Sequence, residues 1–186
     1  MASTITASNE VTIKNLQAAY NGESNAAHKY RLFAVRAEED GYRRVATLFR
    51  AAARAEQIHA ANHVRVLGKM GVTPVAKIEA PEVNSTAENL KVAIAGEEYE
   101  RDVMYPDFIR EAESQNNAAA VRTFRFALDA EAEHAKLYTE ALNNLEAQRR
   151  TTTFYVCIVC GYTTEDAMLV RCAICNSPRE KFEEIG

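Results

Sequence analysis

Apolar and polar residues alternate along most of the chain with the three- and four-residue steps of helices that bury one face. Each such segment ends at a turn signal or where the periodicity is lost. The segments are Leu16–Ala37, Val45–Met70, Leu90–Glu111 and Val121–Leu145. Short polar turns at residues 40–41 and 115–117 separate the first pair and the last pair, so the pattern predicts two antiparallel helical hairpins.

One long connection, residues 71–85, joins the predicted hairpins and carries Pro74 and Pro81. Fully extended, it reaches roughly 50 Å, whereas a helix of roughly 28 residues is about 42 Å long. The connection can therefore run the whole length of the bundle. The predicted fold class is mainly α, a ferritin-like four-helix bundle with one long crossover, followed by a small C-terminal domain.

The two predicted hairpins repeat the same chemistry. Each has a glycine-glutamate pair on its first helix, and a glutamate and a histidine three residues apart on its second. The acidic and histidine residues concerned are Glu23, Glu56, His59, Glu97, Glu131 and His134. Because each turn lies near the midpoint between the two glutamates of its hairpin, we expect all six side chains to meet at one level of the core.

Such a meeting of carboxylates requires cations. Burying one unpaired carboxylate costs several kcal/mol, and a whole domain is stable by only about 5–15 kcal/mol. A glutamate and a histidine three apart on two helices, with one glutamate from each of the others, is the pattern of ferritin-like di-iron and di-manganese proteins. The mixed oxygen and nitrogen donors favour iron or manganese. The sequence thus predicts a carboxylate-bridged pair of metal ions.

Four further residues are expected around this site. Glu100 stands one turn after Glu97 on the same face and is a fifth candidate carboxylate ligand. Tyr30 and Tyr105 are expected to donate hydrogen bonds to ligating carboxylates, with packing of the aromatic core as the alternative. His63 is expected to be a structural or supporting residue and not a ligand.

The cysteines form a second candidate metal site. Two C-x2-C pairs are separated by 11 residues: Cys157 with Cys160, and Cys172 with Cys175. This spacing predicts a tetrahedral thiolate site for iron or zinc, and the spacing alone does not distinguish the two metals. We place the domain boundary after residue 148, giving a bundle of residues 1–148 and a four-cysteine domain of residues 149–186.

Charge and hydropathy exclude several classes of partner. The formal net charge is −4 and the pI is near 5.7, which gives no broad basic field for nucleic acid. The segment from Met1 to Val11 is polar, and no apolar run is long enough to span a bilayer. We therefore expect a cytoplasmic location, with neither nucleic acid nor a membrane as a partner.

The quoted residues, in this order and spacing, resemble the rubrerythrin family over nearly the whole chain. The matching segments are Gly22-Glu23 with Tyr30, residues 55–59, residues 96–100 with residues 104–106, residues 131–134, residues 157–162 and residues 172–175. The resemblance implies a di-iron bundle, and its C-terminal part resembles rubredoxin, whose iron cycles between ferrous and ferric.

The resemblance also implies a role for each ligand. Glu56 and Glu131 would bridge the two irons, Glu23 would be terminal on one iron, and Glu97 with His134 would be terminal on the other.

In this family one iron moves between a glutamate and a histidine ligand as its oxidation state changes. By resemblance, Glu100 and His59 are that exchanging pair. We count Glu100, His59, Tyr30 and Tyr105 as the candidate catalytic residues.

The expected function is a hydrogen peroxide reductase that makes water and protects against oxidative stress. Its electrons would come through the tetrathiolate iron from an NAD(P)H-dependent reductase or a rubredoxin. Two alternatives remain: a ferroxidase or iron-handling protein, and a non-enzymatic metal-binding protein with zinc at the cysteines.

The predicted order of the domains also suggests an assembly. The di-metal level lies roughly 20 Å from the end of the fourth helix, so the cysteine domain of a chain is expected beyond its own di-metal site. A head-to-tail dimer would shorten that path, and we expect a homodimer or a larger homo-oligomer.

Overall fold

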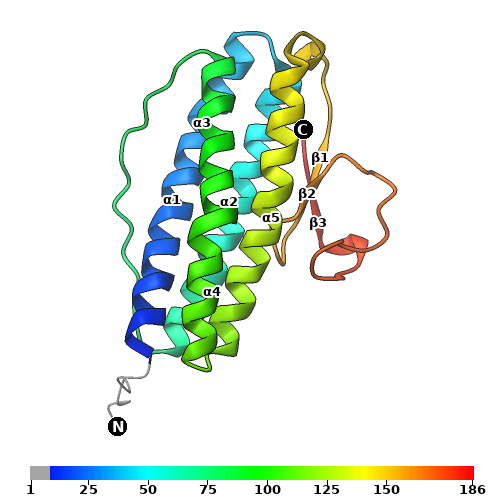
Figure 1. Ribbon diagram of the computed structural model, residues 1–186. Coiled ribbons are helices and arrows are strands. Elements are labelled where there is room, and N and C mark those ends of the chain that lie inside the picture. Colours follow the sequence, from blue (N-terminus) through cyan, green and yellow to red (C-terminus); the bar gives the residue numbers. More distant parts are fainter. Residues whose placement is uncertain (1–8) are drawn as a thin grey trace.

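Antiparallel helices form the larger part of the molecule, as the periodicity predicts (Figure 1). The computed structural model describes residues 9–186. The bundle consists of α1 (Glu10–Glu39), α2 (Arg43–Lys69), α3 (Thr86–Tyr99), η2 (Glu100–Met104), α4 (Tyr105–Ser114) and α5 (Ala118–Asn143). Within residues 9–186, no helix is both long enough and apolar enough to cross a membrane. The polar segment Met1 to Val11, which was not expected to encode secretion, falls largely outside the described residues.

The third predicted helix is interrupted by a turn of π-helix, which the sequence pattern does not anticipate. In this segment, η2, the N–H of Tyr105 donates to the carbonyl of Glu100. Pro106 follows directly, and a proline cannot continue the ordinary hydrogen-bond ladder. The wide turn inserts one residue, so the buried stripe continues through Tyr105 and Ala112. Phe108, which an uninterrupted helical periodicity would bury four residues after Met104, is only half-buried.

The long crossover runs along α1, as expected from its length. Gln17, one turn before Asn21, bonds the backbone of Val75, and Asn21 bonds the backbone of Lys77. One turn further on, Asn25 bonds the backbones of both Lys77 and Glu79. Side-chain amides spaced one helical turn apart on α1 thus hydrogen-bond the backbone groups of alternate residues in the extended crossover. The two hairpins are therefore connected as in ferritin-like bundles.

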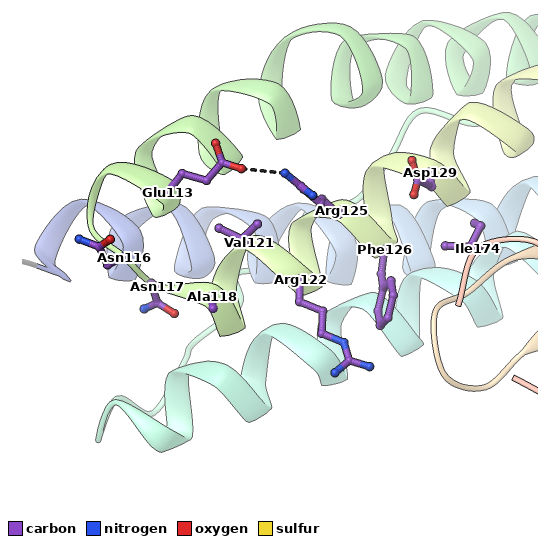
Figure 2. A pocket seen from close by; sticks show the side chains of 10 residues that line it. All are labelled: Glu113, Asn116, Asn117, Ala118, Val121, Arg122, Arg125, Phe126, Asp129 and Ile174. Atoms are coloured by element: carbon purple, nitrogen blue, oxygen red, sulfur yellow. Dashed lines mark hydrogen bonds and ion pairs between the residues drawn. The ribbon is translucent and has the colours of Figure 1, made fainter. Parts of the chain in front are cut away.

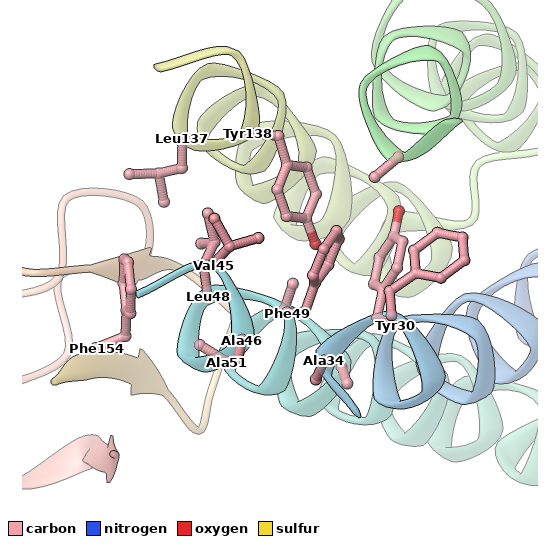
Figure 3. Close-up of a cluster of buried hydrophobic side chains, with 14 of the residues drawn as sticks. Tyr30, Ala34, Val45, Ala46, Leu48, Phe49, Ala51, Leu137, Tyr138 and Phe154 are labelled. Carbon is pink, nitrogen blue, oxygen red and sulfur yellow. The ribbon is translucent and has the colours of Figure 1, made fainter. Parts of the chain in front are cut away.

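An aromatic core fills one half of the bundle (Figure 3). The ring of Tyr138 lies 5.7 Å from that of Tyr30 and 5.1 Å from that of Phe49, measured between centroids. Phe154, which belongs to the C-terminal domain, is fully buried in the same cluster. The two domains therefore share part of one hydrophobic core.

The C-terminal domain is a three-stranded antiparallel sheet with two cysteine turns. It follows a short 3-10 helix, η3 (Leu145–Arg149). Its strands are β1 (Phe154–Cys157), β2 (Thr163–Thr164) and β3 (Phe182–Ile185), in the order β2-β1-β3, and η4 (Arg179–Lys181) precedes β3.

This domain folds back along α2 and α5, beside the middle of the bundle (Figure 1). Two ion pairs tie it to α2: Arg44 with Glu165, and Arg54 with Glu183. The expectation that a chain's cysteine domain lies beyond its own di-metal site is therefore wrong. The apolar side of β1 is buried only when the sheet returns onto the bundle, so the chain turns back after η3. The dimer itself stays a prediction.

Candidate di-metal site and four-cysteine site

The six glutamates and histidines of the repeated pattern lie together in the core. Each is at most 1% exposed. They are Glu23 on α1, Glu56 and His59 on α2, Glu97 on α3, and Glu131 and His134 on α5. The three-residue spacing on α2 and α5 puts glutamate and histidine on the same face, and the hairpin geometry brings the faces to one level.

Two overlapping groups of donor atoms can each hold one cation. The first group is Glu23, Glu56, His59 and Glu131. The second is Glu56, Glu97, Glu131 and His134. Within each group the donor atoms lie within 4.8 Å of one another. Glu56 and Glu131 belong to both groups, which is the geometry expected of two carboxylates that bridge a pair of metal ions.

The electrostatics of this cluster fit a pair of cations. Burial and the neighbouring Glu131 carboxylate raise the pKa of Glu56 well above its ordinary value. Burial and Glu131 have the same effect on the pKa of Glu97. Among the described residues, Glu23 Oε2, Glu56 Oε1 and Glu131 Oε2 have no hydrogen-bond partner. Buried polar atoms are normally satisfied, so these oxygens are free to bind metal.

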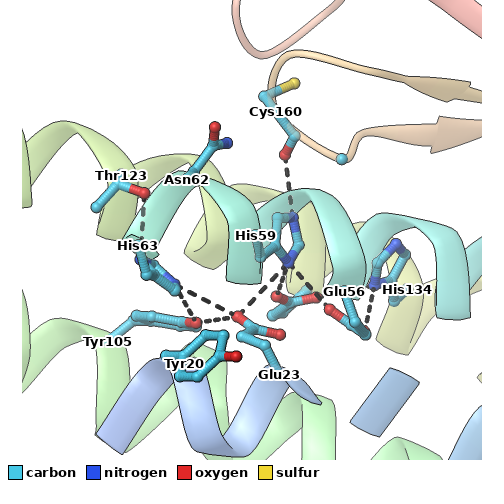
Figure 4. A network of polar contacts seen from close by, with 12 residues as sticks. Tyr20, Glu23, Glu56, His59, Asn62, His63, Tyr105, Thr123, His134 and Cys160 are labelled. Atoms are coloured by element: carbon cyan, nitrogen blue, oxygen red, sulfur yellow. Dashed lines mark hydrogen bonds and ion pairs between the residues drawn. The ribbon is translucent and has the colours of Figure 1, made fainter. Parts of the chain in front are cut away.

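His59 joins the cluster through one ring nitrogen and the cysteine domain through the other (Figure 4). Its Nδ1 lies 2.9 Å from Glu131 Oε1 and 3.0 Å from Glu56 Oε2. Its Nε2 lies 3.0 Å from the backbone carbonyl oxygen of Cys160. Metal-binding histidines commonly have their second nitrogen held in this way.

His134 is oriented in the same manner. Its Nδ1 lies 2.8 Å from Glu131 Oε2 but has no hydrogen-bond partner of acceptable geometry among the described residues. Its Nε2 lies 3.1 Å from the hydroxyl of Thr163 on β2. Both rings therefore present Nδ1 to the carboxylates and Nε2 to the cysteine domain.

The tyrosine contacts expected from the sequence are confirmed. Tyr30 donates to Glu97 Oε1 at 2.6 Å, and Tyr105 donates to Glu23 Oε1. Both hydroxyls are buried. Each therefore orients a glutamate that belongs to only one of the two donor groups.

Glu100 lies next to the cluster but belongs to neither donor group. Its Oε1 is 3.9 Å from the point that a Cβ on Gly22 would occupy. Burial, with a contribution from the charge of Glu23, raises the pKa of the Glu100 carboxyl well above its ordinary value. In this structure His59 is in the ligand position and Glu100 is outside it.

His63 extends the polar network away from the metal level. Its Nε2 lies 3.3 Å from the Tyr105 hydroxyl, and its Nδ1 lies 3.2 Å from the Thr123 hydroxyl (Figure 4). It supports Tyr105, which in turn supports Glu23. This agrees with the expectation of a supporting and not a ligating histidine.

The four cysteines converge on a second site. Cys157 Sγ lies 3.6 Å from Cys175 Sγ, and Cys160 Sγ lies 3.4 Å from Cys172 Sγ. All four are free thiols, and the donor atoms lie within 4.8 Å of one another. A tetrahedral thiolate site with metal–sulfur bonds of about 2.3 Å has its sulfurs about 3.8 Å apart. The arrangement fits one metal ion.

A surface pocket adjoins the cysteine domain but does not open onto the di-metal residues. Its lining includes Arg122 and Phe126 of α5 and Ile174 of the second cysteine turn (Figure 2). None of the candidate ligands lines it.

Comparison with known proteins decides the family. Residues 14–142 match the rubrerythrin family model, and residues 155–183 match the model of the rubrerythrin rubredoxin-like domain. This chain belongs to the rubrerythrin family. It is similar to rubrerythrin-2 of Clostridium acetobutylicum, with 37% identity over 179 residues that cover 94% of this chain and 97% of the relative. Nigerythrin of Nitratidesulfovibrio vulgaris is 38% identical over 172 residues, covering 92% and 85%.

A solved structure agrees with this rubrerythrin assignment. Nigerythrin in its fully reduced, all-ferrous state superposes with a TM-score of 0.88 at 36% identity. The match covers 99% of this chain and 91% of the nigerythrin chain. This rubrerythrin has a ferritin-like di-iron site with carboxylate and histidine ligands and a rubredoxin-like four-cysteine metal site.

Two contacts of this rubrerythrin's di-iron site were not predicted from the sequence: His59 with the carbonyl of Cys160, and His134 with Thr163. The carbonyl of Cys160 is a backbone atom, and Thr163 lies in a domain that was expected far from the site. Neither has a sequence signal, because each depends on where the cysteine domain packs. The domain boundary after residue 148 stays a prediction.

Proposed function

We propose that this rubrerythrin reduces hydrogen peroxide to water at the di-iron site, with electrons delivered through the four-cysteine site. In this reaction peroxide takes up two electrons and two protons, the O–O bond breaks, and two water molecules leave. The observation that carries the proposal is the contact between His59 and Cys160, which joins the two metal sites within one chain.

The donor groups support a specific ligand assignment. We assign Glu56 and Glu131 as bridges and Glu23 as terminal on one metal. Glu97 and His134 are assigned as terminal on the other. When bound by these residues, the two irons would supply the two electrons that peroxide takes up and a local positive charge.

Glu100 and His59 support a change of ligand during the cycle. Both side chains lie beside the first donor group, and only His59 is part of it in this structure. Exchanging the neutral imidazole for a carboxylate adds one negative charge to the ligand set. That exchange would offset the increase in positive charge on oxidation.

Tyr30 and Tyr105 keep the terminal carboxylates in place while the ligands change. Each donates its O–H to one oxygen of a terminal glutamate, which leaves the other oxygen for metal. Their burial excludes solvent from these hydrogen bonds. A hydrogen bond in such a site is stronger than one in water.

The electron path is short. Cys160 supplies a thiolate to one site, and its own carbonyl accepts from His59 Nε2 at 3.0 Å. One residue and one hydrogen bond therefore connect the two centres. The ultimate donor is proposed to be an NAD(P)H-dependent reductase or a rubredoxin, in a cytoplasmic homodimer or larger assembly.

The test is an anaerobic stopped-flow experiment in which the fully reduced protein is mixed with hydrogen peroxide or with dioxygen. We expect the tetrathiolate absorption to return rapidly with peroxide and slowly with dioxygen. Glu56→Ala should abolish the rapid phase while the tetrathiolate iron stays bound. Equal rates with the two oxidants would favour the iron-oxidising alternative, and a colourless, zinc-filled cysteine site would favour the non-enzymatic one.

A further inference from the structure

The hydroxyl of Thr163 makes two hydrogen bonds whose directions can be assigned. It donates its single hydrogen to the carbonyl of Gly161 at 3.1 Å. The same oxygen lies 3.1 Å from His134 Nε2. Thr163 and His134 are both fully buried. With the only hydrogen of the hydroxyl donated to Gly161, the oxygen accepts from His134, which then carries a hydrogen on Nε2.

This assignment decides which nitrogen of His134 can bind metal. A neutral imidazole with a hydrogen on Nε2 has its lone pair on Nδ1. That atom faces Glu131 Oε2 at 2.8 Å without a proper hydrogen bond. In the other tautomer, the Nδ1 hydrogen would point at the carboxylates and block the ligand position.

We propose that Thr163 is a positioning residue of the di-iron site: from the cysteine domain, it holds His134 in the tautomer that leaves Nδ1 free for metal. The di-iron site is then a two-domain site, assembled on the bundle and completed by β2. This inference rests on the ligand assignment made above for His134, and it does not depend on peroxide being the substrate.

A second contact from the same loop acts on the other histidine. The carbonyl oxygen of Cys160 can only accept, so His59 also carries its hydrogen on Nε2. The loop packs tightly against this ring, because a Cβ built on Gly161 would overlap His59 Nε2. The segment from Cys160 to Thr163 thus orients both histidines, and loosening it should weaken metal binding on the bundle.

The first experiment measures binding of ferrous iron by anaerobic titration of the full chain with its cysteine site already loaded. Thr163→Val keeps the shape of the side chain and removes the hydroxyl. We expect its affinity for the di-iron site to fall about 10- to 100-fold, the usual effect of losing such a supporting contact. Thr163→Ser should restore binding.

Two controls separate this effect from misfolding and from an incorrect ligand assignment. Thr139→Val removes a hydroxyl on α5 whose one hydrogen bond within residues 9–186 is to the backbone of Ala135, and this variant should bind iron normally. Glu131→Ala should lose both metals. If Glu131→Ala binds normally, the ligand assignment fails; if it loses metal while Thr163→Val does not, Thr163 has no positioning role. Unchanged tetrathiolate absorption in each variant shows that the cysteine domain is folded.

The second experiment reads the tautomer directly. The full chain, labelled with nitrogen-15 on histidine, is loaded with one equivalent of zinc, which fills the cysteine site. We expect nitrogen chemical shifts of a single tautomer for His134, with the hydrogen on Nε2, and a shift toward the other tautomer in Thr163→Val. The same single tautomer in the variant would overturn the proposal.

Discussion

The Nε2 hydrogen of His59 is donated to the backbone carbonyl of Cys160 across 3.0 Å, so a candidate ligand of the di-iron site touches a candidate ligand of the cysteine site. The two residues are 101 positions apart in the chain. Asn62, one turn after His59, adds a parallel bond to the carbonyl of Val159 at 2.9 Å. The first cysteine turn is therefore fixed on α2 at two adjacent points.

Gly161→Ala should separate the two metal sites. Gly161 has φ +83° and no room for a Cβ beside the His59 ring, so the added methyl must push the cysteine turn away. We expect the tetrathiolate iron of the reduced protein to be reoxidised by peroxide at least about tenfold more slowly, by stopped-flow absorption. Gly71→Ala is the matched control: it has φ +77° but open space. Both substitutions carry backbone strain of about 1–2 kcal/mol, so equal rates in the two variants would contradict the prediction.

Glu131→Ala should remove both irons of the bundle, because Glu131 is in both donor groups. Glu97→Ala should affect mainly one iron, since Glu97 is in only one group. The measurement is iron content per chain together with Mössbauer spectra, with the tetrathiolate iron as internal reference. The control is Glu133, whose carboxylate pairs with Lys136 at the surface: the Glu133→Ala variant should keep all its iron. Full occupancy in Glu131→Ala would refute its bridging role.

Tyr105→Phe should loosen Glu23 without changing the fold. The substitution removes the hydroxyl that donates to Glu23 Oε1 and contacts His63. Removing such a supporting partner typically costs about 10- to 100-fold in metal affinity or activity. Tyr99→Phe, at a side chain that is 57% exposed, is the control. The two variants should have similar thermal midpoints, and only Tyr105→Phe should show the loss in ferrous iron titrations; equal affinities would argue against the role.

Glu165→Gln should destabilise the protein at neutral pH and have less effect in acid. Burial raises the pKa of Glu165, but its hydrogen bonds with Arg44 and Thr152 outweigh this and hold the pKa below the ordinary value of 4.5. A lowered pKa means that the carboxylate stabilises the fold above about pH 4.5 and loses this contribution as the pH falls further.

The measurement compares urea unfolding midpoints of the wild type and Glu165→Gln at pH 7 and at several values below 4.5. Comparing the two proteins at each pH cancels acid effects that they share. The difference between their midpoints should narrow as the pH falls. A difference that stays constant with pH would show that the ion pair with Arg44 does not anchor the cysteine domain to α2.

Much of the di-iron site could be read from residue spacing. Glu56 with His59 and Glu131 with His134 share a helical face because helices repeat every 3.6 residues. Because each turn lies midway between the two glutamates of its hairpin, the ligands of both helices lie at the same level along the bundle axis. The π-helical turn at residues 100–104 could not be read in this way, because a single added residue leaves no periodic signature. Because of this turn, Tyr105 and Ala112 are buried in place of Phe108, which an uninterrupted helix would bury.

The sequence by itself determined the helices, the long crossover, the convergence of acidic and histidine side chains, and the cysteine cluster, because each follows from local periodicity or fixed spacing. Only the tertiary structure decided that the cysteine domain returns to the middle of its own bundle. That placement depends on apolar surfaces such as Phe154 meeting α2 and α5. It brings the Thr163 hydroxyl to His134 and the carbonyl of Cys160 to His59. The contact with the carbonyl cannot be predicted from the sequence, because every residue type has a backbone carbonyl.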